Sequence, residues 1–307
     1  MAACKSGSVE LLFVFDTAVI LSFVLIAVIV ATAYLSKYVH RRKVWYGQMA
    51  QWMIYCISYM LLFGFQRGPK PPEGLCLFQA SLIYASPPAC AVGSACFMID
   101  FYMSLNPLHR RSTPRMPKLD FLLITLPWIT LVGAALQVVL FAVVGRRLDA
   151  VRRTTGFFLC NISDPEPTIV SVVLVLVALV VWFYYEVQSG IIMYQNRLEF
   201  ARLNYRTSRG FISLYIRSAV FTIGILIGTA LSIYSLRHSK GPSGMGDLSV
   251  ALPFMPIFVA LVFGTQKDIM RVWVFWRKRK PEEVSAFSSE LSCTIDEVLL
   301  RQSTILI

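Results

Sequence analysis

The sequence predicts an all-α membrane protein, built as a bundle of seven transmembrane helices with a short amphipathic eighth helix. Three observations support this fold class. Of the 307 residues, 56% are hydrophobic and 15% are charged, whereas about a quarter of the residues in soluble domains are charged. The hydrophobic residues form runs long enough to cross a bilayer, for which a helix needs about 20 residues. Most Lys and Arg residues lie in the short segments between those runs, as membrane topology requires.

Seven apolar runs are predicted to cross the membrane one after another. Within the third run, Pro87 and Pro88 are adjacent and are expected to kink or break the helix, because proline lacks the backbone N–H donor and its ring clashes with the preceding turn. The predicted spans are Leu11–Ser36, Val44–Gln66, Leu75–Leu105, Leu119–Val144, Thr168–Tyr194, Gly210–Leu236 and Leu248–Gln266.

The distribution of positive charge orients the bundle. With the N-terminus outside, the cytoplasmic segments hold 19 of the 29 Lys and Arg residues and the outer segments hold 9. The positive-inside rule therefore places the N-terminus outside and the C-terminus in the cytoplasm. The net charge of +12 follows from this topology. It does not indicate a nucleic-acid partner, because a nucleic-acid binder gathers its basic residues on one face of a soluble fold.

Two of the seven cysteines are predicted to lie together on the outer side. Cys76 stands at the beginning of the third run, and Cys160 lies in the long loop after the fourth run, beside Asn161-Ile162-Ser163. A disulfide persists in that oxidising compartment, so the pair is expected to tie the loop across the mouth of the bundle; the alternative is two free thiols. The triplet matches an N-glycosylation acceptor, which makes Asn161 a candidate glycosylation site.

This arrangement of helices and outer cysteines resembles the G protein-coupled receptor superfamily. At the inner end of the third run stands Asp100-Phe101-Tyr102, followed by Pro107. The motif is similar to the Asp-Arg-Tyr and Pro-Leu pattern of rhodopsin-like receptors, with Phe101 in place of the arginine and one residue fewer before the proline. The rhodopsin-like activation switch therefore does not carry over residue by residue.

The end of the seventh run resembles one particular group of these receptors. It lacks the Asn-Pro-x-x-Tyr motif, and the stretch from Phe263 to Asp268 resembles fungal orphan seven-transmembrane receptors. The resemblance implies a plasma-membrane receptor that binds an extracellular small ligand or peptide and signals to a heterotrimeric G protein.

Three ionisable residues inside the apolar runs are the most informative polar feature. Asp100, Glu186 and Arg217 lie in the third, fifth and sixth runs, each about 9–13 Å from the cytoplasmic end at about 1.5 Å per residue. A charge within a span costs at least about 2.5 kcal/mol on insertion scales, so it normally faces the bundle and serves a function. We hypothesise that Arg217 pairs with Asp100 or Glu186 at rest. The alternative is that each side chain extends to the membrane interface.

The second and third cytoplasmic loops are short and basic. Their arginines are expected to form a docking surface for a G protein. The alternative is that these charges serve membrane topology and contact with anionic lipids, in which each residue near the surface contributes about 1 kcal/mol. The sequence does not separate these two interpretations. The residues expected at the G protein interface are Arg110, Arg111, Arg197, Arg202 and Arg206.

The chain after the seventh run is predicted to lie on the membrane surface. In residues 267–281, the apolar side chains of Ile269, Val272, Trp273 and Trp276 recur at helical spacing among basic residues, and Pro281 follows. This pattern is typical of an interfacial amphipathic helix. We therefore expect a membrane domain over residues 1–281 and a flexible cytoplasmic tail over residues 282–307.

Polar residues in the outer half of the bundle are candidate ligand-pocket residues. They are Gln79, Ser81 and Tyr84 in the third run and Gln137 in the fourth.

An enzyme is not expected, nor a metal or cofactor, because the three histidines lie in the connections and the spans carry no such ligand set. The main alternative function is a seven-helix transporter or lipid exporter, whose substrate path the intramembrane charges and the proline pair would line.

Overall fold

The structure is a computed structural model in which the chain divides into two units, Met1–Ile269 and Met270–Ile307. It describes residues 7–36, 39, 41–66, 70–105, 117–153, 159–195, 212–224 and 254–273. Of the second unit, only Met270–Trp273 is described, as the last part of helix α11 (Lys267–Trp273). The unit boundary thus lies inside the predicted amphipathic helix 267–281. The rest of that helix and the predicted tail 282–307 lie outside the described residues.

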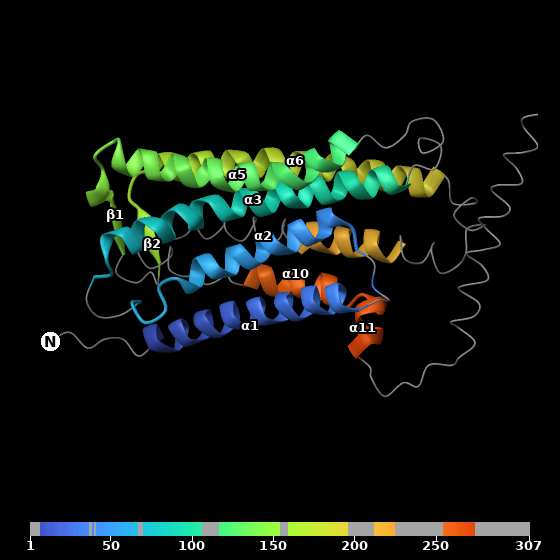
Figure 1. Ribbon diagram of the computed structural model, residues 1–307, viewed down its shortest axis with the longest axis horizontal. Coiled ribbons are helices and arrows are strands. Elements are labelled where there is room, and N and C mark those ends of the chain that lie inside the picture. Colours follow the sequence, from blue (N-terminus) through green and yellow to red (C-terminus); the bar gives the residue numbers. More distant parts are fainter. Residues whose placement is uncertain are drawn as a thin grey trace, which may run out of the picture. The chain divides into compact units, whose positions relative to one another are not determined.

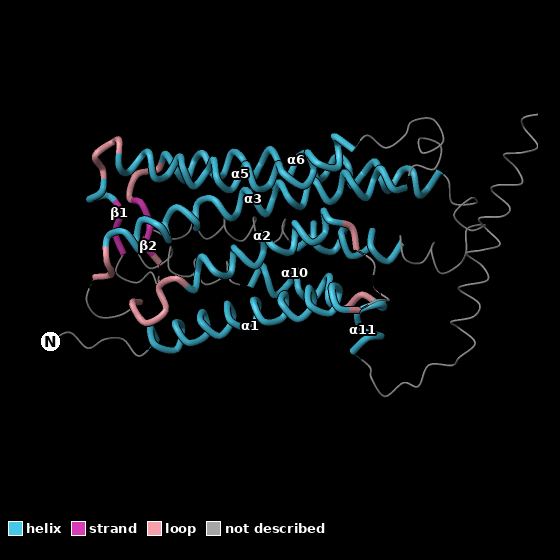
Figure 2. Tube along the Cα trace, viewed as in Figure 1, coloured by secondary structure: helices cyan, strands magenta, loops and turns pink. Residues whose placement is uncertain are grey.

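The described part of the first unit is almost entirely helical (Figures 1 and 2). Four helices, α1, α3, α5 and α6, are long and apolar enough to cross a membrane, and two shorter apolar helices follow them. Each lies on one of the predicted runs, although α2 ends at Met60 rather than Gln66. The helices are α1 (Gly7–Leu35), α2 (Lys43–Met60), α3 (Glu73–Leu105), α5 (Pro117–Val143), α6 (Glu166–Gln195), the helix Ile212–Gly224 and α10 (Phe254–Gly264).

The described helices of the bundle other than α5 contact one another in a closed ring. Helix α1 packs against α2 and α10, and α3 packs against α2, α5 and α6. Phe221 of the helix Ile212–Gly224 contacts Trp182 of α6 and Phe258 of α10, with ring centroids 5.7 and 6.0 Å apart. Helix α3 also reaches α10, because the ring centroids of Phe97 and Phe263 are 5.7 Å apart. Helix α3 therefore contacts its neighbours α2, α5 and α6 and also α10 across the ring.

Helix α3 continues through Pro87 and Pro88, so the two prolines do not break it, and a kink at this point stays a prediction. Next to the prolines, Ala85 and Ala89 are fully buried and pack against Leu131 of α5. Small side chains allow the neighbouring helix to approach closely, and this packing stabilises a segment from which proline has removed backbone donors.

A two-stranded hairpin between α5 and α6 departs from the predicted all-α class. After the short 3-10 helix η1 (Leu148–Ala150), strands β1 (Val151–Arg153) and β2 (Cys160–Ile162) pair antiparallel, with Arg153 opposite Cys160. Strands of three residues are too short for sequence periodicity to reveal. Along β2, Cys160 and Ile162 are buried and Asn161 is half-buried, which is the alternation expected of a strand with one covered face.

The exterior of this molecule is more apolar than that of a soluble protein, and several polar side chains are buried inside it. Large apolar side chains project outward from α5 and α6, whereas several amide and acidic side chains are buried between helices. The outward group, between 63% and 70% exposed, contains Phe121, Ile129, Val132 and Val180. The buried polar group contains Gln48, Gln51, Gln79, Asp100 and Glu186. An apolar exterior of this extent matches a lipid environment better than water.

Candidate functional site

Polar contacts gather at the two ends of the ring, here called the hairpin end and the arginine end. At the hairpin end, Cys76 in the first turn of α3 is bonded to Cys160 at the beginning of β2, and their Cα atoms are 5.4 Å apart. Both residues are buried. The structure thus brings together the two cysteines that the sequence placed on one side of the membrane, and it fastens β2 to the beginning of α3 (Figure 1).

Two residues predicted for the ligand pocket hold this hairpin. The Gln79 Oε1 atom accepts a hydrogen bond from the backbone N–H of Cys160 at 3.0 Å, and its Nε2 atom donates to the carbonyl of Ser58 at 3.2 Å. The Tyr84 hydroxyl accepts from the backbone N–H of Ile162 at 3.3 Å. The fully buried Gln79 amide therefore links α2, α3 and β2. Its use by a ligand stays a prediction.

The other residues that the sequence predicted at the hairpin end have the following surroundings. Ser81 is buried and donates to the carbonyl of Phe78 at 2.8 Å. Gln137 is half-buried on α5. Asn161 pairs with Arg152 across the hairpin and is half-buried. Its glycosylation stays a prediction.

At the arginine end, which comprises Arg41, Arg42, Asp100, Arg217 and Gln266, Asp100 pairs with a residue that sequence reasoning did not select. The Arg42 Nη1 atom lies 2.9 Å from Asp100 Oδ1, and the side chains are 47% and 6% exposed, respectively. Arg42 directly precedes α2. The cation that meets this buried carboxylate therefore comes from the α1–α2 connection.

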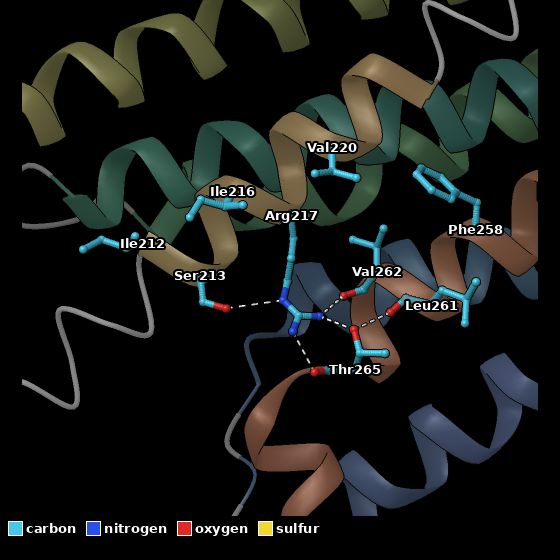
Figure 3. A pocket seen from close by; sticks show the side chains of 9 residues that line it. All are labelled: Ile212, Ser213, Ile216, Arg217, Val220, Phe258, Leu261, Val262 and Thr265. Atoms are coloured by element: carbon cyan, nitrogen blue, oxygen red, sulfur yellow. Dashed lines mark hydrogen bonds between the residues drawn. The ribbon is translucent and has the colours of Figure 1, made fainter.

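Arg217 binds the C-terminal end of α10 (Figure 3). Its Nη1 atom donates to the carbonyl of Val262 at 2.6 Å and to the Thr265 hydroxyl, and its Nη2 atom donates to the carbonyl of Thr265 at 2.7 Å. Nε donates to the Ser213 hydroxyl at 3.3 Å. The last carbonyls of a helix have no partner within it and carry partial negative charge, so a guanidinium is well suited to this position.

Glu186 has hydroxyl partners on the helix Ile212–Gly224. Its carboxylate accepts from Ser218 at 3.0 Å and from Thr222 at 2.6 Å, and the indole N–H of Trp182 donates to the Thr222 hydroxyl at 2.9 Å. Glu186 is 5% exposed.

The expected pairing of Arg217 with Asp100 or Glu186 differs from the arrangement of the described residues. Successive residues of an α-helix point about 100° apart. Ser218 therefore faces α6 and Glu186, while Arg217 faces α10. Asp100 meets Arg42.

A second arginine joins the α1–α2 connection to the segment between α10 and α11. Arg41 donates to the side-chain oxygen of Gln266, and its guanidinium lies 5.7 Å from the ring centroid of Trp45. Arg41 and Arg42 could have been selected from the sequence as cations on the same predicted side as Asp100. Their partners could not, because Arg41 and Gln266 are 225 positions apart and no local spacing relates them.

In the middle of α2, two buried polar side chains have no hydrogen-bond partner within the described structure. Both amide atoms of Gln51 and the indole N–H of Trp52 are in this state, and Gln51 is 1% exposed. Gln48, one turn away, donates to Ser94 at 2.6 Å. Buried polar groups are normally paired with protein, water or a ligand, so Gln51 is a candidate ligand contact that sequence reasoning missed.

The described residues contain no group of three or more His, Cys, Asp or Glu side chains that could hold a metal ion. The predicted G protein interface, Arg110, Arg111, Arg197, Arg202 and Arg206, lies outside the described residues. No protein-family model matches the sequence, and no curated protein matches it.

Proposed function

We propose that this protein is a plasma-membrane receptor with seven transmembrane helices, which binds an extracellular ligand within the bundle and signals to a heterotrimeric G protein. The N-terminus lies outside, and each of the seven apolar runs crosses the bilayer. The closed ring of helix contacts from α1 to α10, with a disulfide-held hairpin at one end only, carries this proposal. A disulfide belongs to the oxidising side of a membrane, so the arginine end faces the cytoplasm.

The interior of the ring supports a small ligand rather than a large one. The hairpin is held to α3 by a covalent bond and by hydrogen bonds from Gln79 and Tyr84, so the mouth of the bundle has a fixed rim. Deeper in the bundle, Gln51 offers a donor and an acceptor for which the described residues supply no partner. We place the centre of the ligand site at Gln51 and Trp52.

The arginine end supplies the moving part. Arg217 joins the sixth run to the end of the seventh through the carbonyls of Val262 and Thr265. Outward movement of the helix Ile212–Gly224 breaks these bonds and uncovers the backbone acceptors of Val262 and Thr265. The resting contact of this proposal is therefore Arg217 with α10, in place of an arginine–carboxylate lock.

Nucleotide-sensitive association with a G protein α-subunit tests the proposal. The purified full chain is incubated with a panel of α-subunits in GDP and in GTPγS, and co-purification is measured. We expect one subunit class to bind with GDP or without nucleotide and to be released by GTPγS. Absence of nucleotide-sensitive binding across the panel would contradict the receptor function, and it is the behaviour expected of a transporter or lipid exporter.

Two matched arginine sets make the test specific. Replacing Arg110, Arg111, Arg197 and Arg202 with Ala is expected to abolish association. Replacing four arginines between α5 and β2, which the proposal puts outside, removes the same charge and is expected to leave association unchanged. This control set is Arg146, Arg147, Arg152 and Arg153. Equal loss in both variants would indicate nonspecific electrostatic binding.

A further inference from the structure

An open groove runs between the helix Ile212–Gly224 and α10. Its volume is about 600 Å³, and Figure 3 shows the side chains that line it. They are Ile212, Ser213, Ile216, Arg217, Val220, Phe258, Leu261, Val262 and Thr265. The groove opens away from the interior, because Ile216, Val220 and Leu261 are 55%, 46% and 53% exposed, whereas Phe221 on the same helix is buried.

Polar and apolar groups separate along this groove. Ser213, Arg217 and Thr265 lie together at the end where α10 finishes, joined by the hydrogen bonds drawn in Figure 3. Val220 and Phe258 lie further along the two helices, toward the middle of the apolar segments. One positive charge and several hydroxyl and carbonyl groups thus lie at one end of a groove whose other end is apolar.

The charge of the groove identifies the class of its occupant. Arg217 is the one charged residue among the nine that line it, and none is acidic. The hydrogen bonds to Ser213, Val262 and Thr265 hold the guanidinium at this end of the groove, where its positive charge attracts the phosphate of an anionic lipid. An apolar tail with a phosphate at one end matches both parts of the groove.

We propose that this groove binds a single anionic phospholipid, with its phosphate at Arg217 and Ser213 and one acyl chain along Ile216, Val220 and Phe258. The site rests on the proposed insertion and orientation of the chain in a membrane and not on G protein coupling. Its lipid comes from the cytoplasmic leaflet, where anionic lipids are concentrated. The bound lipid bridges the helix Ile212–Gly224 and α10, so it stabilises the contact between them.

Native mass spectrometry of the purified full chain in detergent tests the site by titration of two lipids with identical acyl chains. We expect phosphatidylglycerol to bind about fivefold more tightly than phosphatidylcholine, as one arginine near a lipid phosphate provides. Equal affinity for the two lipids would overturn the proposal. Soluble glycerol phosphate at the same concentration is expected not to compete. Competition as strong as that of the lipid would show a phosphate site rather than a lipid groove.

Two substitutions on the same helix separate the groove from general contact with lipid. Ile216 and Ile223 are 55% and 56% exposed, but only Ile216 lines the groove. Ile216→Trp fills the apolar part of the groove and is expected to weaken phosphatidylglycerol binding, whereas Ile223→Trp is expected to bind as the unaltered chain does. Equal effects of the two variants would refute the site.

Substitutions of Arg217 test the phosphate contact. Arg217→Leu is expected to remove the preference for phosphatidylglycerol, and Arg217→Lys is expected to keep part of it because the charge remains. If Arg217→Leu does not fold, Arg217→Lys and Ile216→Trp decide the outcome. A lipid preference unchanged in Arg217→Lys and in Ile216→Trp would place the bound lipid elsewhere.

Discussion

The two ends of the helical ring are held by different kinds of interaction. At the hairpin end, a disulfide and backbone N–H groups fix β2 to α3, and the side chains involved, Cys76, Gln79 and Cys160, are buried. At the arginine end, side chains of Arg41, Arg42 and Arg217 reach across to neighbouring helices, and Arg42 is 47% exposed. The first set contains a covalent bond and buried hydrogen bonds, whereas Arg42 in the second set is accessible to solvent.

This difference divides rigidity and movement between the ends. A buried hydrogen bond that loses one partner leaves the other unsatisfied, at a cost of about 1–3 kcal/mol. A half-exposed ion pair loses about 0.2–1 kcal/mol, because water replaces the missing charge. The proposed receptor function needs this combination, with a fixed rim at the hairpin end and contacts at the arginine end that open at low cost.

Removal of the disulfide is the strongest way to break the contrast. The bond closes a separation of 84 residues, so Cys76→Ala is expected to reduce the free energy of unfolding by about 4 kcal/mol through the entropy of the unfolded chain. Thermal unfolding in detergent, followed by tryptophan fluorescence, measures the loss. Cys96→Ala removes a buried free thiol and serves as the control. Similar destabilisation in both variants would show that the disulfide adds no stability beyond the packing of a buried cysteine side chain.

Gln79→Leu tests the hydrogen-bonded part of the hairpin end. The substitution leaves the buried N–H of Cys160 and the carbonyl of Ser58 without this partner, and we expect a loss of about 2 kcal/mol. Hydrogen exchange of residues 159–162 is expected to accelerate at the same time. Gln137→Leu on α5 is the matched control and should leave that exchange unchanged. Unaltered exchange in Gln79→Leu would exclude the anchoring role.

A double-mutant cycle measures the ion pair at the arginine end. Asp100→Asn, Arg42→Gln and the double variant are expected to give a coupling energy of about 1 kcal/mol in thermal unfolding, because Asp100 is buried and Arg42 is half-exposed. Additive effects of the two substitutions would mean that Asp100 is stabilised by something other than Arg42.

The smallest effect is expected from an exposed pair at the hairpin end. Arg147 and Asp164 lie 3.1 Å apart with side chains 50% and 31% exposed. The same cycle with Arg147→Gln and Asp164→Asn is expected to give about 0.3 kcal/mol, further reduced by salt. A coupling larger than that of Arg42 and Asp100 would reverse the ranking of the charged contacts by burial.

The sequence predicted those features that depend on composition and on sidedness. Apolar runs located the helices, and the prediction that Cys76 and Cys160 lie on the same side of the membrane located their bond. The partners of Asp100 and Arg217 were not predictable, because they depend on which face of each helix turns toward which neighbour. The hairpin escaped prediction because three-residue strands have no periodic signal, and the role of Gln79 escaped because its partners are backbone groups.

Adjacent residues on the helix Ile212–Gly224 bind to different neighbours, Arg217 to the end of α10 and Ser218 to Glu186 of α6. A rotation of this helix about its long axis therefore strains both sets of hydrogen bonds at once, because they lie on different faces of the helix. A tilt of the helix at the arginine end can release Arg217 first and leave Ser218 in place. The arrangement thus favours a tilt of this helix about its contact with α6 over a rotation of the helix about its own axis.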